Sequence, residues 1–310
     1  MRLIFMGTSS FALPSLQALA AAGHEIVAVV TQPDKPQGRG QRLAPPPIKE
    51  LAESLGLPVL QPVKIREEGA IQTLRELAPE LAVVVAYGQL LPNTVLTLPA
   101  RGCINLHASL LPKYRGAGPI AWALLNGEEE TGVTSMLIEE ALDSGPILLQ
   151  ERVPIHEEDT AGSLHDRLAE IGARLLVKTV EGVGQGRLRP QPQDHEKATY
   201  APKLQKSDGR IDWSRPGRQI YNQIRGLDPW PGAYTSLKEE GLKIWSARPG
   251  AGVLEREAGA VISVEDAGIL VQTGEGALLL RELQPESRRR MTAKEFLAGH
   301  PLSPGARLGE

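Results

Sequence analysis

Apolar residues in the first half of the chain gather in short continuous runs that predict strands, at residues 3–6, 25–31, 58–60, 81–86, 104–107 and 132–138. Between these runs the apolar positions follow helical spacing, at residues 11–22, 67–77, 121–126 and 160–181. The run at 81–86 is almost wholly apolar, as expected of a strand covered on both faces. Strands that alternate with helices predict an α/β fold, a doubly wound and mostly parallel Rossmann-like sheet.

The pattern changes near residue 189. Three prolines and charges of both signs interrupt residues 189–206, which we expect to form a linker. From 207 onward a short helix at 219–225 precedes brief apolar runs separated by glycine and acidic turns, at 233–235, 242–246, 260–264, 268–273 and 277–283. This pattern predicts a small β-barrel or sandwich, of which we expect an OB-like barrel. The expected organisation is therefore a first domain at 1–188, a linker at 189–206 and a second domain at 207–310.

Composition narrows the functional classes. The 310 residues carry a formal net charge of −3 and one cysteine, Cys103, so no internal disulfide or cysteine-cluster zinc site is possible. The histidines lack the spacing of metal ligands, and we expect no metal. No apolar run approaches the ~20 residues of a membrane helix, and we expect no signal peptide before the first strand. We expect a cytoplasmic protein that does not associate with membranes, with a monomer favoured.

Two polar residues mark the end of the strand at 104–107. Asn105 and His107 are two positions apart, so both side chains project from the same face. An amide can donate to a developing oxyanion, and an imidazole can move a proton near neutral pH. Asp143 follows the strand that ends near 138, and we expect it at the same carboxyl edge of the sheet, where it would stabilise a charged His107. Each residue alone has a more ordinary structural role, but the three together favour a catalytic site.

The glycine and proline clusters of the first domain do not fit nucleotide-binding fingerprints. Neither residues 7–10 nor residues 38–40 form a G-x-G-x-x-G pattern, and no Walker lysine follows them. Residues 32–47 hold five prolines and two glycines, which is long for a strand-to-helix connection. No acid lies within 35–49, whose charges are Lys35, Arg39, Arg42 and Lys49. This segment is either a solvated loop or a cationic finger for phosphates.

Residues 105–107 (NLH) and 109–117 (SLLPKYRGA) resemble the signature of the folate-dependent formyltransferases. The likeness covers essentially the whole chain and is greatest to the members that act on methionyl-tRNA. It includes further blocks at 7–8, 31–34, 38–40, 84–88, 142–145, 200–201, 210–213 and 228–232. Two small departures, Gly118 and Ser144, replace residues of similar size.

The resemblance implies a mechanism. An amine attacks the formyl carbon of 10-formyltetrahydrofolate, Asn105 and protonated His107 stabilise the oxyanion, and Asp143 keeps His107 charged and helps pass the proton. No metal and no covalent enzyme intermediate are needed. A flat pterin needs an apolar slot with polar groups at its rim, and core packing is an equally good interpretation of its leucines. The residues expected to form this slot are Ser109, Leu110, Leu111, Pro112, Tyr87, Gly88 and Leu90.

The resemblance also implies that initiator methionyl-tRNA is the acceptor, bound by positive patches despite the net acidity. The candidate contacts are Lys35, Arg39, Arg42, Lys49, Lys203, Lys206, Arg288, Arg289 and Arg290. Within enzymes, the alternative is a formyltransferase that acts on a small amine such as an amino sugar. An inert RNA-binding protein would leave the three polar residues unexplained, and the missing glycine fingerprint argues against a Rossmann oxidoreductase.

Overall fold

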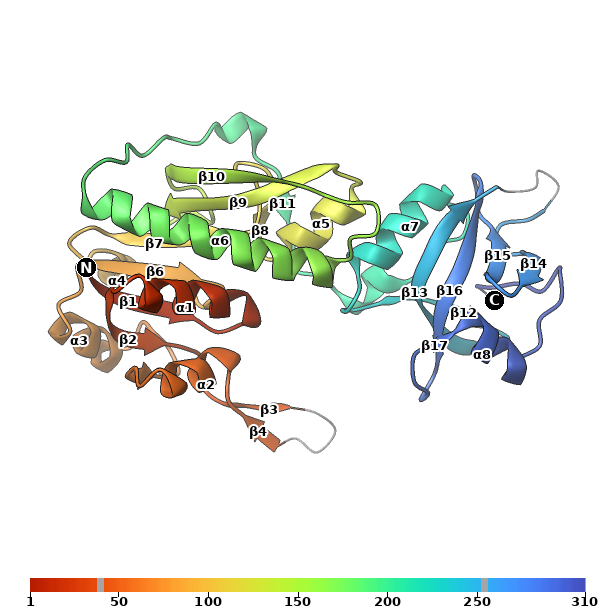
Figure 1. Cartoon of the computed structure of the whole chain (residues 1–310), viewed down its shortest axis with the longest axis horizontal. Helices are drawn as coiled ribbons and strands as arrows, with labels where there is room; N and C mark the ends of the chain where they lie inside the picture. The colour runs from red at the N-terminus through yellow and green to blue at the C-terminus, as the bar shows by residue number, and fades with distance from the viewer. Residues whose placement is uncertain (38–41, 252–255, 310) are drawn as a thin grey trace. The chain divides into compact units, whose positions relative to one another are not determined.

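The structure is a computed structural model that describes residues 1–37, 42–251 and 256–309 (Figure 1). The chain forms two compact units. The first comprises Met1–Pro119, Glu130–Pro154 and His165–Ala201, and the second comprises Ile120–Glu129, Ile155–Leu164 and Pro202–Glu310. The first unit thus extends into the segment expected to be a linker, through residue 201.

The first unit is built on a seven-stranded sheet with the order β10-β9-β7-β6-β1-β2-β5. Its strands are β1 (Arg2–Gly7), β2 (Glu25–Val30), β5 (Val59–Leu60), β6 (Leu81–Val85), β7 (Cys103–His107), β9 (Glu130–Leu137) and β10 (Ile147–Pro154). The pairings from β5 to β7 are parallel, whereas β9 is antiparallel to both β7 and β10. The predicted doubly wound, mostly parallel sheet is confirmed. Strand β10 was not predicted.

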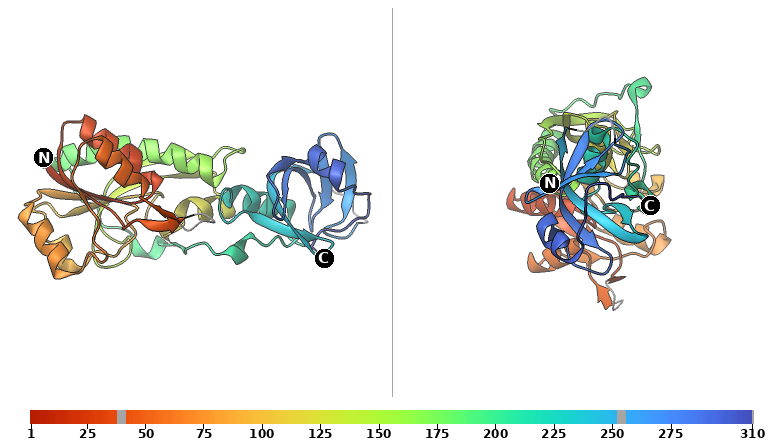
Figure 2. Two further views of the ribbon diagram at one scale, coloured as in Figure 1. Left: turned by 90° about the horizontal axis from the view of Figure 1, so that it is seen from below. Right: turned by 90° about the vertical axis from the view of Figure 1, so that its right-hand side faces the viewer.

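Helices cover both faces of this sheet. Ile4, Met6 and Cys103 on one face share a buried cluster with residues of α3 (Glu68–Glu76) and α4 (Asn93–Leu96). On the other face Leu106 packs against α6 (Ala161–Gly184), where a Cβ on Gly172 would lie 2.7 Å from a Leu106 methyl carbon. The left panel of Figure 2 shows α6 in green and α3 in orange on opposite sides of the strands. Burial on both faces accounts for the continuous apolar runs.

The proline-rich segment after β2 contains a short hairpin and a helix, neither of which was predicted. The hairpin pairs β3 (Lys35–Gln37) with β4 (Arg42–Ala44), and α2 (Pro47–Ser54) follows. Arg39 and the 38–40 block lie outside the described residues. At the base of the hairpin the Lys49 ammonium lies 2.9 Å from a carboxylate oxygen of Asp34. Hydrogen bonds from Gln61 and then Lys49 hold the pKa of Asp34 below its usual value.

The residues after α6 pack onto the first unit. A 3-10 helix, η2 (His195–Lys197), precedes β11 (Tyr200–Ala201), which pairs in parallel with β8 (Arg115–Gly116). Upstream, the backbones of Ile147 and Gln191 exchange two hydrogen bonds of 2.8 Å. These contacts bring residues 191–201 next to the loops around β7 and β10. The other 3-10 helix of this unit is η1 (Ser10–Ala12), which leads into α1 (Leu13–Ala21).

The second unit contains an antiparallel sheet of six strands in the order β12-β13-β16-β15-β14, with β17 paired to β16. Its elements are α5 (Pro119–Leu125, from Ile120 onward), η3 (Lys206–Gly209), α7 (Gly217–Gly226), β12 (Ala233–Leu237), β13 (Glu240–Gly250), β14 (Val261–Glu265), β15 (Gly268–Gln272), β16 (Ala277–Pro285), β17 (Met291–Thr292) and α8 (Ala293–Gly299). The predicted small antiparallel β domain is confirmed. Closure into an OB-like barrel stays a prediction, because β12 and β14 stand at the two ends of the described strand order.

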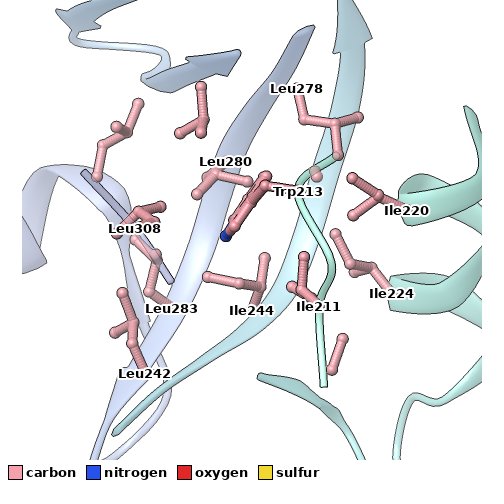
Figure 3. Close-up of a cluster of buried hydrophobic side chains, with 14 of the residues drawn as sticks. Ile211, Trp213, Ile220, Ile224, Leu242, Ile244, Leu278, Leu280, Leu283 and Leu308 are labelled. Carbon is pink, nitrogen blue, oxygen red and sulfur yellow. The ribbon is translucent and has the colours of Figure 1, made fainter. Parts of the chain in front are cut away.

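An apolar core fills the concave side of this second sheet. Figure 3 shows Trp213 among the labelled side chains, with Ile220 and Ile224 reaching in from α7 and Ile244 and Leu280 from the strands. The Trp213 indole N–H donates to the Thr235 hydroxyl at 3.0 Å, so its one polar group is satisfied inside the core. Within the described residues, no helix combines the length and apolar character needed to cross a membrane.

Candidate active site

The carboxyl end of β7 carries the two predicted polar side chains on one face. Asn105 is half-buried and His107 is buried, and both lie on the side of the strand that also holds Cys103. The Asn105 amide makes no hydrogen bond with any described residue. An amide at a strand end without a partner in the described protein is free to donate to a ligand.

The His107 ring contacts a carbonyl on one side and a carboxylate on the other. Its Nε2 lies 2.8 Å from the Tyr114 carbonyl oxygen, and its Nδ1 lies 3.7 Å from Asp143 Oδ2. A carbonyl can only accept, so Nε2 must carry a proton. The ring is thus held between a carbonyl and a carboxylate, with Nδ1 on the side of Asp143.

Asp143 reaches His107 by a route that differs from the expected one. Because β9 runs antiparallel to β7, its carboxyl end at Leu137 lies opposite Ile104 at the start of β7, not beside His107. The expectation that Asp143 follows a strand ending at the same edge is therefore wrong. The β9–β10 loop instead turns back and delivers the carboxylate, with Asp143 at a φ of +48° and its Oδ2 accepting the Gly116 N–H at 2.8 Å.

Two further side chains support the Asp143 loop, and sequence reasoning missed both. The Gln193 amide nitrogen donates to the carbonyl oxygens of Asp143 and Gly145, at 2.9 and 2.8 Å. Its amide oxygen accepts from Arg115 Nε and Nη2, at 3.2 and 2.7 Å. Arg115 lies inside the 109–117 signature, where no separate role was predicted for it. Gln193 lies in the expected linker, and no periodicity or motif in the sequence marks it.

Gly116 approaches the neighbouring strand too closely for a side chain. Its φ is +114°, and a Cβ there would lie 2.7 Å from the Ala201 carbonyl oxygen. We expect Gly116→Ala to lower the free energy of unfolding by about 2–4 kcal/mol, from the disfavoured φ and the overpacking together. Urea unfolding measures this loss. Gly186→Ala is the matched control, because Gly186 has a φ of +66° with nothing within 4 Å of its Cβ position. Equal losses in the two variants would contradict the close approach.

The residues expected to line a folate slot divide into two groups. The side chains of Ser109, Leu111 and Tyr87 are buried, and burial raises the pKa of the Tyr87 phenol to about 12. Ser109 is bonded internally, its hydroxyl donating to the Lys113 carbonyl at 2.7 Å. The other expected residues are partly or fully exposed, namely Leu110, Pro112, Gly88 and Leu90. Leu90 is 83% exposed, which makes it one of the most exposed large apolar side chains that the structure describes.

Other features of the first unit do not join the three polar side chains. A cavity of about 240 Å³ lies against α3 and the ends of β2 and β5, and none of Asn105, His107 and Asp143 lines it. Cys103 is buried, and burial raises the pKa of its thiol to about 12, which opposes a nucleophilic role. Among the residues that the structure describes, no group of three or more His, Cys, Asp or Glu side chains is placed to hold a metal ion.

The candidate phosphate-binding residues differ in how far their charges are neutralised. Lys49, Arg289 and Arg290 pair with carboxylates of Asp34, of Glu295, and of Asp228 and Glu282, respectively. Arg290 also lies over the Trp245 ring, 5.3 Å from its centroid. The candidates that are exposed and make no ion pair with a described residue are Lys35, Arg42, Lys203, Lys206 and Arg288.

In this Rossmann-like sheet, an inner strand, β7, ends in an amide and an imidazole beside a carboxylate, an arrangement suited to a group-transfer enzyme. Residues 1–180 match the formyl transferase family, and residues 203–301 match the formyl transferase C-terminal domain. The chain belongs to the formyl transferase family, and the family predicted from the sequence is confirmed.

The relatives narrow this class. The chain is 54% identical over 309 residues to methionyl-tRNA formyltransferase of Moorella thermoacetica, covering 100% of this chain and 99% of that protein. It is 49% identical over 310 residues to the protein of the same name from Geobacter sulfurreducens, covering 100% and 97%. Solved structures share the fold at lower identity. The sugar 3N-formyl transferase WlaRD has a TM-score of 0.67 at 19% identity, covering 93% of this chain and 99% of that chain.

Proposed function

We propose that this chain transfers the formyl group of 10-formyltetrahydrofolate to the amino group of methionyl-tRNA, the step that prepares the initiator tRNA for translation. One observation carries the proposal. The amide of Asn105 and the His107–Asp143 pair meet at one strand end of a formyl transferase domain, with a contact of 3.7 Å between His107 and Asp143. The similarity to proteins named methionyl-tRNA formyltransferase extends over the full length of the chain, which favours tRNA over a small amine as acceptor.

The side chains divide the chemistry between them. Asn105 donates to the formyl oxygen as negative charge develops on it, and the His107 imidazolium adds a second favourable charge. The acceptor nitrogen forms a bond to the formyl carbon while the bond from that carbon to N10 of the folate breaks. His107 and Asp143 take up the proton that the amine loses and pass it to the departing nitrogen. The charges therefore balance without a metal or a covalent enzyme intermediate.

The folate is proposed to lie against the exposed apolar side chains around the three polar residues. Leu90 and Leu142 are 83% and 53% exposed, and they can cover the faces of a flat pterin. Gly88, Leu110 and Pro112 complete the proposed walls. The buried side chains of Ser109, Leu111 and Tyr87 can contribute only through their backbones in this conformation.

The tRNA is proposed to contact the unpaired cations of both units, with the catalytic domain at 1–188 and a tRNA-binding domain at 207–310. Arg42 is exposed on β4 and makes no ion pair with a described residue, whereas Lys49 is held by Asp34 at 2.9 Å. Arg42 is therefore the better candidate within the hairpin for contact with a phosphate. We further propose that the protein works as a monomer. We also propose that it works in the cytoplasm, where charged initiator tRNA and reduced folate are available.

We expect Arg42→Ala to raise the KM for methionyl-tRNA by roughly 10-fold, a loss of about 1–2 kcal/mol, while the KM for 10-formyltetrahydrofolate stays unchanged. The raised KM should depend less steeply on salt, because one phosphate contact is lost. Steady-state kinetics at several salt concentrations measures both effects. Arg66→Ala is the matched control, since Arg66 is another exposed arginine of the same unit. An equal change in both variants would attribute the effect to net charge and not to contact.

The activity itself is tested by transfer of radiolabelled formyl groups. The purified protein is given 10-formyltetrahydrofolate with charged initiator tRNA, with uncharged tRNA, or with an amino sugar nucleotide. We expect label only in the methionyl-tRNA, and only with the folate present. Transfer to the amino sugar but not to methionyl-tRNA would establish the alternative acceptor, and no transfer to any acceptor would refute formyl transfer.

A further inference from the structure

The Gln193 carboxamide connects a buried arginine to the loop that carries Asp143. Gln193 is 6% exposed and Arg115 is 4% exposed, so both side chains are removed from water. The oxygen of the carboxamide accepts two N–H groups from Arg115, and its nitrogen donates to two carbonyl oxygens of the Asp143 loop. Every hydrogen-bonding position of the carboxamide is thus used, which is the condition for a rigid buried polar network.

The orientation of this amide is decided by its partners. A guanidinium carries only N–H groups, so the atom of Gln193 that faces Arg115 must be the oxygen. The nitrogen then has to face the carbonyl oxygens of Asp143 and Gly145, at 2.9 and 2.8 Å. Arg115 therefore does more than fill space, because it directs the amide donors onto the loop.

Arg115 is itself held in place. Its backbone N–H donates to the Thr199 carbonyl at 2.8 Å, next to the pairing of β8 with β11. Its Nη2 also lies 3.2 Å from His195 Nδ1. The next residue, Gly116, binds the Asp143 carboxylate through its N–H at 2.8 Å. Residues 115 and 116 thus hold Asp143 at two points, the carboxylate directly and the backbone carbonyl through Gln193.

Asp143 benefits from such support because its φ of +48° lies in a sparsely populated region, although aspartate enters that region more easily than most residues. Without these contacts the β9–β10 loop would be free to leave this conformation. The carboxylate would then leave the 3.7 Å contact with His107 on which proton transfer depends.

We propose that Gln193, oriented by Arg115, is a positioning residue that holds Asp143 against His107 during formyl transfer. The inference rests on the proposed function and extends it to a residue that touches neither substrate. The segment after α6 would then position a catalytic residue as well as connect the two units.

The test is Gln193→Glu, which keeps the shape of the side chain and pairs with Arg115 but offers no N–H to the Asp143 loop. We expect kcat to fall by roughly 10- to 100-fold, the effect of a misplaced catalytic group, with KM values for both substrates within about twofold. Urea unfolding should show a folded protein, since the new carboxylate pairs with the buried guanidinium. Gln193→Ala, which loses both sets of bonds, is measured alongside. Gln191→Ala is the matched control, because the Gln191 side chain is exposed in the same segment.

A double-mutant cycle with Asp143→Ala separates positioning from general damage. If Gln193 acts through Asp143, Asp143→Ala and Asp143→Ala/Gln193→Glu should have the same kcat. A further fall in the double variant, or a normal kcat in Gln193→Glu beside an impaired Asp143→Ala, would overturn the inference and leave the proposed function standing. Normal turnover of Asp143→Ala would remove Asp143 from the catalytic set, and the positioning role of Gln193 with it.

Discussion

Replacing Asn105 by alanine is expected to lower kcat for formyl transfer by roughly 10²- to 10³-fold, the scale on which the loss of one oxyanion donor acts. The Asn105 amide lies on the His107 face of β7 and makes no hydrogen bond with a described residue, so its donor is available to the reacting oxygen. The interaction strengthens only as charge develops, and the KM values for both substrates should therefore change little. Steady-state kinetics with methionyl-tRNA and 10-formyltetrahydrofolate measures both constants.

Asn105→Asp sharpens this prediction. The aspartate keeps the size of the side chain, loses the donor and adds a negative charge beside the oxyanion, so its kcat should fall below that of Asn105→Ala. Asn93→Ala is the control, since Asn93 is exposed at the start of α4 in the same unit. A raised KM with unchanged kcat in Asn105→Ala would make Asn105 a substrate-binding residue instead.

His107→Gln should lower kcat by roughly 10²-fold or more, because glutamine can still donate to a carbonyl but cannot carry or release a proton near neutral pH. In the structure His107 contacts the Tyr114 carbonyl at 2.8 Å and Asp143 at 3.7 Å, and glutamine can reproduce only the first of these contacts. The pH dependence of kcat, as well as its size, should therefore change. Pre-steady-state formyl transfer over a pH series measures both.

A second histidine–aspartate pair in the same unit provides the control. His165 Nδ1 lies 2.9 Å from Asp166 Oδ1 on α6, and the side chains of His165 and Asp166 are 30% and 85% exposed. His165→Gln should leave kcat and its pH profile as they are. A His107→Gln variant with near-normal turnover would exclude His107 as the proton carrier and leave it a structural role.

The parallel part of the sheet was predictable because its strands are buried on both faces. Strands β1 and β6 read as unbroken apolar runs, and both are almost completely buried. Strand β10 escaped prediction because only Leu148 and Val153 are buried in it, and because as an edge strand it carries glutamine, glutamate and arginine. Its absence from the prediction concealed the reversal of strand direction at β9, and with it the route of the Asp143 loop.

The predicted basic residues were also visible in the sequence, but the ion pairs that they form were not. The acid-free stretch at 35–49 was visible in the sequence, and Arg42 is exposed in it as expected. Asp34 lies one residue before that stretch, and only the fold brings it to Lys49 and neutralises that charge. Arg289 and Arg290 likewise form ion pairs with Glu295, and with Glu282 and Asp228, that only the fold brings together.

Local geometry alone placed Asn105 and His107 on one face, because side chains two apart on a strand project to the same side whatever surrounds them. The motifs around them were sufficient for the family. The route by which Asp143 reaches His107, and the support of Asp143 by Gln193, came only from the tertiary structure. Gln193 and Asp143 are 50 residues apart, and the contact between them depends on the direction of β9 and on the course of residues 191–201. Such long-range contacts leave no periodic trace along the chain.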